Sequence, residues 1–252
     1  MQRPYIFCHM RPSLMGKIWG AYIQEPYCDA SAQFYFDVGF GPDCVRPYQA
    51  WLLGSNTAEV GWTNYKKPAL DENAPPVPEG DFIVNKPGKY LAVLDPDAVL
   101  AWEQDYAVYG GMAAREGEGI RFNVLEILTG NSSNAYRAML RRLNIPYIIA
   151  GDTAIDTRTA LFKLKTLFGI DTAILGGGGA LNWSYISEGL CDELSLVLAP
   201  AADGAVNTPS VFYAVDGLSR ETTVTFTFEK VEVLQGDTVH LLYKVNNALP
   251  LE

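Results

Sequence analysis

Basic residues are scarce in this sequence: 19 Lys and Arg stand against 29 Asp and Glu, and the net charge of the 252 residues is −10. Surfaces that bind nucleic acids or acidic membranes need clustered Lys and Arg for their contacts with phosphates. No apolar run reaches about 18 residues, and the N-terminus lacks the apolar core and cleavage site of a signal peptide. We therefore expect a cytoplasmic protein with neither a nucleic-acid nor a membrane partner.

Cysteine and histidine are also scarce. The four cysteines, Cys8, Cys28, Cys44 and Cys191, show no paired spacing, which argues against a zinc site and against a disulfide framework. With two histidines and no Gly-x-Ser-x-Gly sequence, a catalytic serine triad has little support. No metal site is predicted, and His9, which lies in an apolar run, is interpreted as a hydrogen-bonded core residue.

The order of apolar runs and helical patterns predicts one α/β domain over residues 1–252. In the middle of the chain strands alternate with helices, which is typical of a mostly parallel sheet covered on both faces. Near the C-terminus, Val224–Leu234 and Thr238–Val245 alternate with period two on either side of a glycine turn, which predicts an antiparallel hairpin. The strands expected before the hairpin are Pro4–Met10, Pro47–Leu53, Tyr90–Leu94, Tyr106–Tyr109, Asn123–Leu128, Pro146–Ala150, Thr172–Leu175 and Leu194–Ala199.

Helix starts are predicted from capping residues. Asn56 or Thr57 would cap a short helix after the second strand, and Asp152 or Thr153 would cap a longer one that runs to Phe168.

The proline-rich stretch and Glu126 each have two interpretations. A proline-rich excursion at about residues 62–89 is irregular, with a candidate strand at Phe82–Val84, and is either a lid or an insertion over one face. Glu126, inside the apolar run of Asn123–Leu128, lies either on a solvent-facing side of the strand, which is the favoured interpretation, or in a pocket.

The most informative stretch follows the expected strand Thr172–Leu175. Four glycines, Gly176–Gly179, lead into a helical pattern from Ala180 to Glu188. Glycine lets an anion approach the backbone, and the free N–H groups and dipole of the following helix favour negative charge there. No Lys-Ser or Lys-Thr pair follows, and Leu181 stands in place of the third glycine of a dinucleotide fingerprint. A phosphate cradle and a flexible turn that binds nothing are the two interpretations.

Three segments together resemble one family. They are Ser13-Leu-Met-Gly16-Lys17-Ile18 after the first strand, Gly54-x-x-Thr57 after the second, and the glycine loop followed by Leu181-Asn182 and by Gly189–Leu194. In order and spacing they are similar to the reductase domain of riboflavin biosynthesis, the RibD C-terminal domain. The resemblance covers the chain from Arg3 to Lys244. It implies a dihydrofolate reductase-like three-layer sandwich, a nicotinamide cofactor, usually NADPH, and a homodimer. Members typically reduce the ribose of a ribosylaminopyrimidine phosphate.

The resemblance also implies which residues face the cofactor, and two that follow a parallel strand are added to them. The predicted cofactor-binding residues are Ser13, Gly16, Gly54, Ser55, Thr57, Gly151, Asp152, Gly177, Gly178, Gly179, Ala180, Leu181 and Asn182. Asn182 would orient the cofactor or cap the backbone. Lys17 is the candidate catalytic residue, because its ammonium would polarise a carbonyl or hold a hydroxyl; the alternative is a surface lysine on a loop.

The substrate side departs from the family pattern. Met15 stands where the family has an aspartate, and Gly176 where it has a glutamate held against the substrate. Ser55 stands in place of an arginine, and no arginine-bearing stretch for a substrate phosphate follows Thr57. The expected function is therefore NADPH-dependent reduction of a small heterocyclic or sugar-like carbonyl or imine, with NADH as the alternative cofactor.

Two other hypotheses stay open at this point. One is a catalytically impaired nucleotide-binding protein of the same fold, and the other is a phosphosugar-binding domain that uses only the glycine loop. Several aromatic residues would stack on a flat substrate or pack in the core: Trp19, Phe34, Tyr35 and Phe36. Candidate cations for a ribose 2′-phosphate are Arg11, Lys66 and Lys67.

Overall fold

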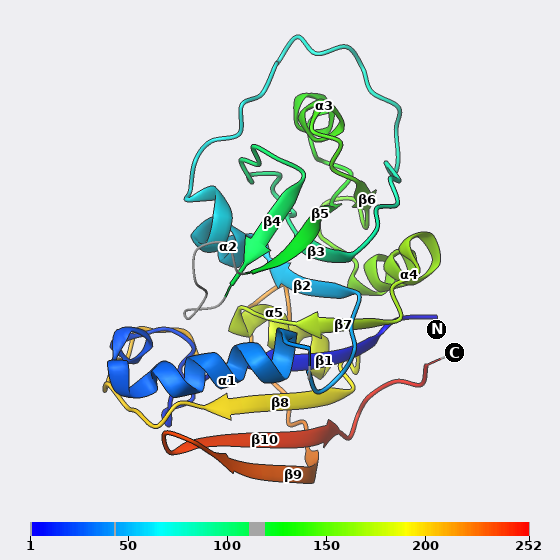
Figure 1. Cartoon of the computed structure of the whole chain (residues 1–252). Helices are drawn as coiled ribbons and strands as arrows, with labels where there is room; N and C mark the ends of the chain where they lie inside the picture. Colours follow the sequence, from blue (N-terminus) through cyan, green and yellow to red (C-terminus); the bar gives the residue numbers. More distant parts are fainter. Residues whose placement is uncertain (1, 43, 111–118, 252) are drawn as a thin grey trace.

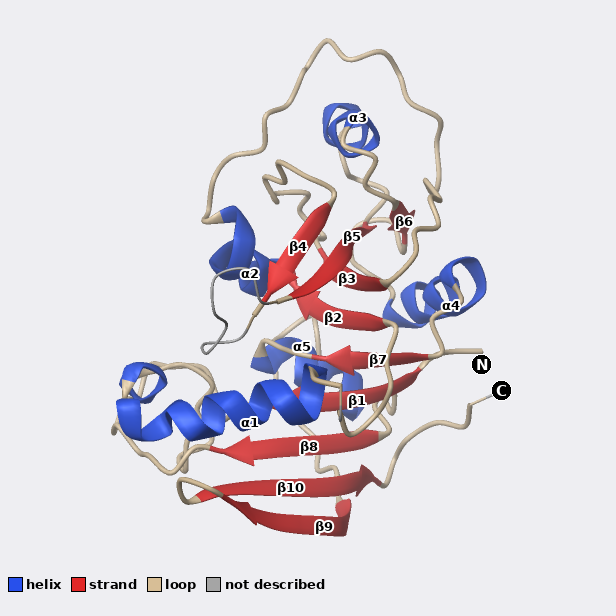
Figure 2. Cartoon of the chain, in the orientation of Figure 1, coloured by secondary structure: helices blue, strands red, loops and turns tan. Residues whose placement is uncertain are grey.

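A ten-stranded mixed sheet forms the middle layer of the molecule (Figure 1, Figure 2). The computed structural model describes residues 2–42, 44–110 and 119–251, and every statement on the fold refers to these. The strand order is β4-β5-β3-β2-β7-β1-β8-β10-β9, with β6 paired to β5. The strands are β1 (Tyr5–Met10), β2 (Ala50–Gly54), β3 (Lys89–Leu94), β4 (Tyr106–Tyr109), β5 (Ile120–Leu128), β6 (Tyr147–Ile149), β7 (Thr172–Leu175), β8 (Glu193–Leu198), β9 (Phe226–Leu234) and β10 (Thr238–Val245).

The centre of the sheet is parallel, and its two sides are antiparallel. Strand β7 lies between β1 and β2, and β3 and β5 continue the parallel order. The predicted C-terminal hairpin joins the sheet through β10, which is antiparallel to β8 and β9. Strand β4 pairs antiparallel with β5, which the sequence did not indicate. The carboxyl ends of β1, β2 and β7 therefore meet at one edge, and the arrowheads of β2, β7 and β8 point to the same side in Figure 2.

Helices cover both faces of the sheet. They are α1 (Asp29–Phe40), α2 (Ser55–Ala58), α3 (Asn134–Arg142), α4 (Thr157–Phe168), α5 (Gly179–Ser187), the 3-10 turns η1 (Ala21–Gln24) and η2 (Pro26–Cys28), and the π-helical turn η3 (Glu59–Thr63). Successive side chains of a strand point to opposite faces, so Ile6 and Cys8 pack in the cluster with α4 and α5, whereas Phe7 packs with α1 and α3. The expected α/β three-layer sandwich is confirmed.

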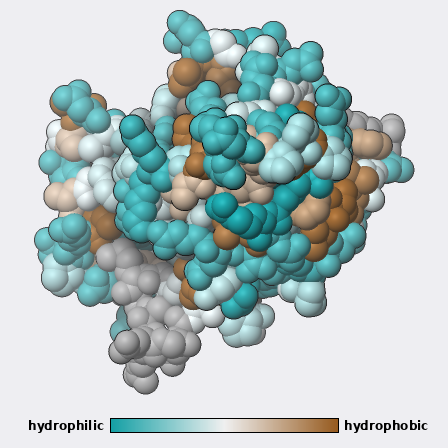
Figure 3. All heavy atoms as spheres, turned by 90° about the horizontal axis from the view of Figure 1, so that it is seen from above, coloured by the Kyte–Doolittle hydropathy of each residue, from teal (hydrophilic) through white to brown (hydrophobic). Residues whose placement is uncertain are grey.

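The surface is mostly polar. Hydrophilic residues dominate the face seen in Figure 3, and hydrophobic residues form separate patches among them. All four cysteines are free thiols. None of the helices in the described ranges is long and apolar enough to cross a bilayer, and no group of three or more His, Cys, Asp and Glu there could hold a metal ion.

The predicted cap of the helix that ends at Phe168 is wrong, because Asp152 and Thr153 lie in the preceding loop. Helix α4 is capped by Asp156, whose carboxylate accepts the N–H of Arg158 at 2.9 Å. Strand β6 is followed by Gly151 with φ +96°, and the chain turns there before the helix begins. Residues 151–156 therefore form a loop between β6 and α4 rather than the first turn of the helix.

The predicted cap of the short helix after β2 is wrong as well. Helix α2 starts at Ser55, one or two residues before the predicted caps Asn56 and Thr57. Its cap position is Gly54, whose extended backbone (φ −87°, ψ 160°) also ends β2. The strand therefore passes into the helix without an intervening loop.

The proline-rich excursion is an insertion over α3 (Figure 1). The N–H of Val77 donates to Asn134 Oδ1 at 2.9 Å, and Arg141 Nη2 donates to the Pro78 carbonyl at 3.3 Å. The predicted strand Phe82–Val84 is wrong in extent, since only Phe82 forms a bridge, with Tyr147. This stretch lengthens the α3 side of the molecule and ties it to the sheet.

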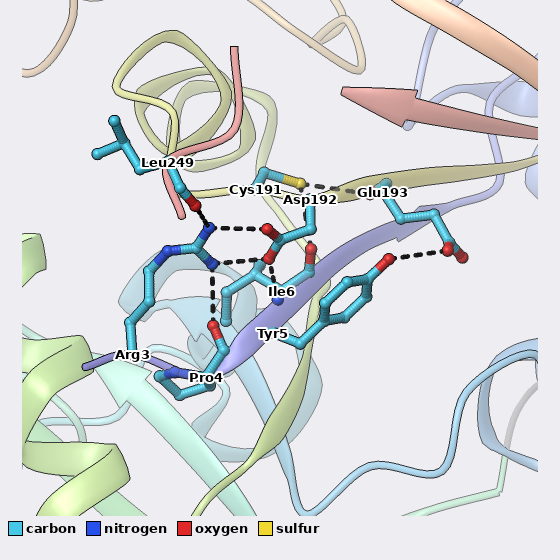
Figure 4. A network of polar contacts seen from close by, with 8 residues as sticks. All are labelled: Arg3, Pro4, Tyr5, Ile6, Cys191, Asp192, Glu193 and Leu249. Atoms are coloured by element: carbon cyan, nitrogen blue, oxygen red, sulfur yellow. Dashed lines mark hydrogen bonds and ion pairs between the residues drawn. The ribbon is translucent and has the colours of Figure 1, made fainter. Parts of the chain in front are cut away.

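Arg3, near the N-terminus, forms a buried ion pair with Asp192 and a hydrogen bond to the C-terminal segment (Figure 4). Arg3 Nη1 and Nη2 each lie 2.7 Å from an oxygen of Asp192, and Nη2 also donates to the Leu249 carbonyl at 2.6 Å. The N–H of Ile6 donates to the same carboxylate at 2.8 Å. Arg3 is 2% exposed and Asp192 is 9% exposed, so the pair is shielded from water. Asp192, which belongs to the segment Gly189–Leu194, therefore serves the fold.

The interpretation of Glu126 as a solvent-facing residue is wrong, because it has no exposed surface. One carboxylate oxygen accepts the indole N–H of Trp102, and the other has no partner among the described residues. Strand β5 lies inside the sheet between β3 and β4, and the core covers both its faces. Burial, and to a lesser degree Asp95, raise the pKa of Glu126 well above its ordinary value.

The wild type is expected to lose free energy of unfolding as pH rises, because Glu126 must ionise inside the core. Glu126→Gln is expected to lack this loss. A carboxyl with a raised pKa in the folded state stabilises fully below its unfolded pKa, about 4.5, and this contribution is lost as pH rises towards the folded pKa. Urea unfolding between about pH 5 and 8 would show the wild type losing at most about 1.4 kcal/mol per pH unit relative to Glu126→Gln. The exposed Glu79→Gln serves as control; identical pH profiles of wild type and Glu126→Gln would contradict the prediction.

Candidate functional site

A cleft of about 1740 Å³ opens where the parallel strands end. Met10 ends β1, Gly54 ends β2, Leu94 ends β3 and Gly176 follows β7, and all four line it. Ligands of open α/β sheets bind at this edge. The volume exceeds the roughly 300–1,000 Å³ of a site for one drug-sized molecule, so the cleft has room for two ligands side by side.

The glycine loop lines the cleft beside the end of β2. Its backbone is held by the neighbouring strand β2: the N–H of Gly176 donates to the Leu52 carbonyl at 2.9 Å, and the N–H of Gly54 donates to Gly177 at 3.1 Å. Gly177 has φ +95°, a conformation that glycine adopts without steric cost, and the Gly177–Gly178 peptide bond is cis. The predicted strand Thr172–Leu175 and the turn after it are therefore ordered as one unit with β2.

The start of α5 presents free backbone donors to the cleft. Gly178 is the cap residue and provides no side chain, and the N–H of Asn182 is the first to bond within the helix, to Gly178 at 2.9 Å. The N–H groups of Gly179, Ala180 and Leu181 have no partner among the described residues. A Cβ on Gly178 would meet no atom within 4 Å, so a ligand can approach the backbone closely. This geometry suits a phosphate or pyrophosphate group.

The segment 208–213 closes the outer side of the glycine loop. Asn182, which is fully buried, donates through Nδ2 to the Val211 carbonyl at 3.2 Å. A Cβ on Gly179 would lie 2.0 Å from the Ser210 carbonyl oxygen, so glycine alone fits there. Asn182 therefore holds this segment against α5.

Eight of the sixteen residues predicted for the site line the cleft, and eight do not. Those that line it are Gly54, Ser55, Thr57, Gly176, Gly178, Gly179, Ala180 and Leu181. Those that lie outside its lining are Ser13, Met15, Gly16, Lys17, Gly151, Asp152, Gly177 and Asn182. The first group surrounds the ends of β2 and β7, which lie side by side in the sheet.

The placement of Lys17 does not support its predicted role at the reacting end. Its ammonium donates to the Thr208 carbonyl at 2.9 Å, and its backbone forms a bridge with Ser210. Ser13 is buried and its hydroxyl accepts the N–H of Lys17 at 3.3 Å. Lys17 therefore fastens the loop after β1 to the segment 208–213, and Ser13 stabilises the loop itself.

The sequence patterns did not indicate the cation that lines the cleft. Arg158, in the first turn of α4, is the only Lys or Arg among the described lining residues. It is exposed and lies 3.4 Å from Glu188, a weak surface pair. The predicted candidates for a ribose 2′-phosphate, Arg11, Lys66 and Lys67, are not part of this lining. Recognising Asp156 as the cap of α4 would have placed Arg158 at the cleft.

The end of the cleft beside β4 is aromatic. Trp51, from β2, lies 4.8 Å from Tyr109 and 5.8 Å from Trp62, measured between ring centroids, and all three line the cleft. A Cβ on Gly176 would lie 1.9 Å from Trp51 Nε1, so the indole occupies the space that a side chain at 176 would need. Tyr35 and Trp19 also line the cleft.

The buried histidine belongs to the core. His9 Nδ1 lies 2.9 Å from the Ser195 hydroxyl and Nε2 lies 2.8 Å from the Tyr35 carbonyl, as the interpretation of a hydrogen-bonded core residue predicts. Burial lowers the pKa of His9 to about 4, so the ring is neutral at physiological pH. Burial raises the pKa of Tyr109 to about 12, so its phenol stays protonated in the same range.

Comparison with known proteins gives the chain a family and a fold. The model of the RibD C-terminal domain family matches residues 43–240. Among solved structures, a pyrimidine reductase-like protein from Corynebacterium diphtheriae is 16% identical, with a TM-score of 0.63, and the match covers 96% of this chain and 92% of that one.

Two further structures share the fold. RibD from Acinetobacter baumannii is 17% identical with a TM-score of 0.61; the match covers 97% of this chain and 58% of that longer one. The riboflavin biosynthesis reductase Rib7 from Saccharomyces cerevisiae is 14% identical with a TM-score of 0.56, covering 96% and 90%. At these identities the likeness establishes the common fold.

Proposed function

The chain belongs to the RibD C-terminal domain family, and on that premise we propose that it is an NADPH-dependent reductase of a small carbonyl or imine compound. The observation that carries this proposal is the set of free N–H groups at the start of α5, which open onto a cleft large enough for a dinucleotide and a second ligand. Rib7 is itself described as a riboflavin biosynthesis reductase, which supports the reaction class. A homodimer and a cytoplasmic location stay predictions.

The residues present fit a dinucleotide phosphate. Gly178 leaves open space at the cap of α5, and Gly179, Ala180 and Leu181 offer donors for the pyrophosphate. Ser55 and Thr57 line the cleft at the end of β2 and add hydroxyl donors. When bound, NADPH supplies a hydride to the carbon of a C=O or C=N bond, whose heteroatom takes up a proton from solvent as NADP⁺ forms.

Arg158 is the proposed partner of the ribose 2′-phosphate, because it is the one described cation that lines the cleft. A guanidinium matches a phosphate through two parallel hydrogen bonds, and its present pair with Glu188, at 3.4 Å and exposed, costs little to break. This assignment makes NADPH the preferred cofactor over NADH.

We expect NADPH at about 100 times its dissociation constant to stabilise the protein by about 2.7 kcal/mol, or roughly 5 to 10 °C in melting temperature.

Arg158→Ala should weaken NADPH binding about tenfold and leave NADH binding unchanged, because NADH lacks the 2′-phosphate. Calorimetric titration of both cofactors measures this, with the exposed Arg142→Ala on α3 as control.

A lack of any melting shift with either cofactor would contradict the proposal. Equal losses of NADPH and NADH affinity in Arg158→Ala would reject the 2′-phosphate assignment alone. Cofactor binding without NADPH oxidation across pterins, pyrimidines, aldehydes and quinones would identify the chain as a nucleotide-binding protein that has lost catalysis.

A further inference from the structure

The two ends of the cleft differ in chemistry. The end around the glycine loop and the 153–158 loop holds backbone donors, hydroxyls and the three charged lining residues that are described, Asp156, Arg158 and Glu188. The end beside β4 holds rings and aliphatic side chains, and no charged side chain lines it within the described ranges. A dinucleotide phosphate suits the first end, which leaves the second for the molecule that is reduced.

The aromatic end is built as a connected wall. Trp51 is its centre: it is 4% exposed, packs edge-on against Phe40 at 4.7 Å between ring centroids, and contacts Tyr109 and Trp62. The orientation of Trp62 is fixed by a hydrogen bond to β4, since its indole N–H donates to the Val108 carbonyl at 3.0 Å. These rings are therefore held in place before any ligand arrives.

Other rings of the cleft lining are exposed to solvent. Trp19 is 55% exposed, and Tyr65, three residues after Trp62, is 65% exposed. Large apolar side chains left in water around one concavity mark a surface that a ligand covers. Rings favour a flat partner, because stacking uses the whole face of both molecules.

A phosphate would be poorly held at this end. Arg11 lines an adjoining side pocket of about 160 Å³ together with Tyr35 and Tyr109, and it donates to the Ser31 hydroxyl at 3.1 Å. A charged phosphate buried against rings without a cation would lose its hydration with no compensation. Within the described ranges, the side chains that line this end therefore favour an uncharged ring over a sugar phosphate.

We propose that the substrate is a flat, uncharged ring compound that carries the reducible C=O or C=N group and lies against Trp62 at the aromatic end of the cleft. This inference rests on the proposed reductase function for the reaction. Binding of the ring compound to the aromatic end does not require the cofactor.

The test measures ring binding directly. Quenching of intrinsic tryptophan fluorescence and calorimetry would follow pteridine-2,4-dione and 1-naphthaldehyde as flat uncharged probes, with ribose 5-phosphate and uridine 5′-monophosphate as phosphorylated probes. Trp62→Leu should lower the affinity for the flat probes about tenfold, and Trp62→Phe should retain most of the wild-type affinity. The matched control is Trp183→Leu on α5, since Trp183 lies outside the lining and its indole N–H also donates to a carbonyl, that of Arg220, at 3.0 Å.

Several results would overturn the proposal. They are failure of both flat probes to bind at millimolar concentration, tighter binding of ribose 5-phosphate, equal effects of Trp62→Leu and Trp183→Leu, and competitive displacement of the flat probes by NADPH. If the wild type does not bind NADPH, the proposed function is rejected, and the effects of Trp62→Leu and Trp62→Phe on the flat probes then decide ring binding.

Discussion

Replacing Gly178 by aspartate is expected to weaken NADPH binding about 100-fold while the protein stays folded. Gly178 caps α5 with extended backbone (φ −65°, ψ −174°), and a Cβ there would meet no atom within 4 Å. An aspartate would accept the N–H groups of Ala180 and Leu181, which are the donors proposed for the pyrophosphate, and its negative charge would repel the phosphates. Two lost charge-assisted hydrogen bonds correspond to about 3 kcal/mol.

Matched variants at Gly178 separate charge from size. Gly178→Ala adds a methyl group without a hydrogen-bond acceptor and should bind NADPH nearly as the wild type does. Gly178→Asn occupies the same N–H groups without a charge and should fall between the two. Melting temperatures verify folding, because aspartate and asparagine at a cap are at least as favourable as glycine. NADPH affinity within threefold of the wild type in Gly178→Asp would refute the assignment of the pyrophosphate site.

Arg3→Ala is expected to cost about 3 to 5 kcal/mol of unfolding free energy, or on the order of 10 °C in melting temperature. The substitution leaves the buried carboxylate of Asp192 without its cation, although the N–H of Ile6 still donates to it. It also leaves the Leu249 carbonyl without its guanidinium donor, so the C-terminal segment loses its attachment to β1 (Figure 4).

A double-mutant cycle tests this interpretation. Arg3→Met with Asp192→Leu replaces both charges by apolar side chains and should be less destabilised than Arg3→Ala alone, because no unpaired charge is left in the core. Arg158→Ala breaks the exposed pair with Glu188 and should change stability by less than about 1 kcal/mol. A loss below about 1 kcal/mol in Arg3→Ala would show that the pair contributes little.

The two predictions concern different parts of the family resemblance. The glycine loop is exposed to the cleft, and we propose that it binds the cofactor. The segment Gly189–Leu194 lies away from the cleft and contributes Asp192 to the clamp between β1, β8 and the C-terminal segment. A sequence pattern typical of a family therefore combines residues of the site with residues of the scaffold.

Sequence alone determined the local elements. The strand Thr172–Leu175, the strand Tyr106–Tyr109, the C-terminal hairpin and the helix after the glycines were all predicted, with boundaries close to those observed. These features depend on neighbours in the chain: apolar runs, glycine turns and period-two alternation are properties of a few consecutive residues. The parallel centre of the sheet followed from the alternation of strands and helices.

Only the tertiary structure decided which side chains meet. Lys17 donates to the Thr208 carbonyl because a segment nearly 200 positions later packs on its loop. Arg158 reaches the cleft because α4 starts three or four residues later than the predicted caps imply. Glu126 is buried because strand order places β5 inside the sheet. Trp51 fills the space beside Gly176 because β2 and β7 are neighbours, a pairing between residues more than 100 positions apart. Contacts of this kind depend on the global packing of the sheet, and no local pattern contains them.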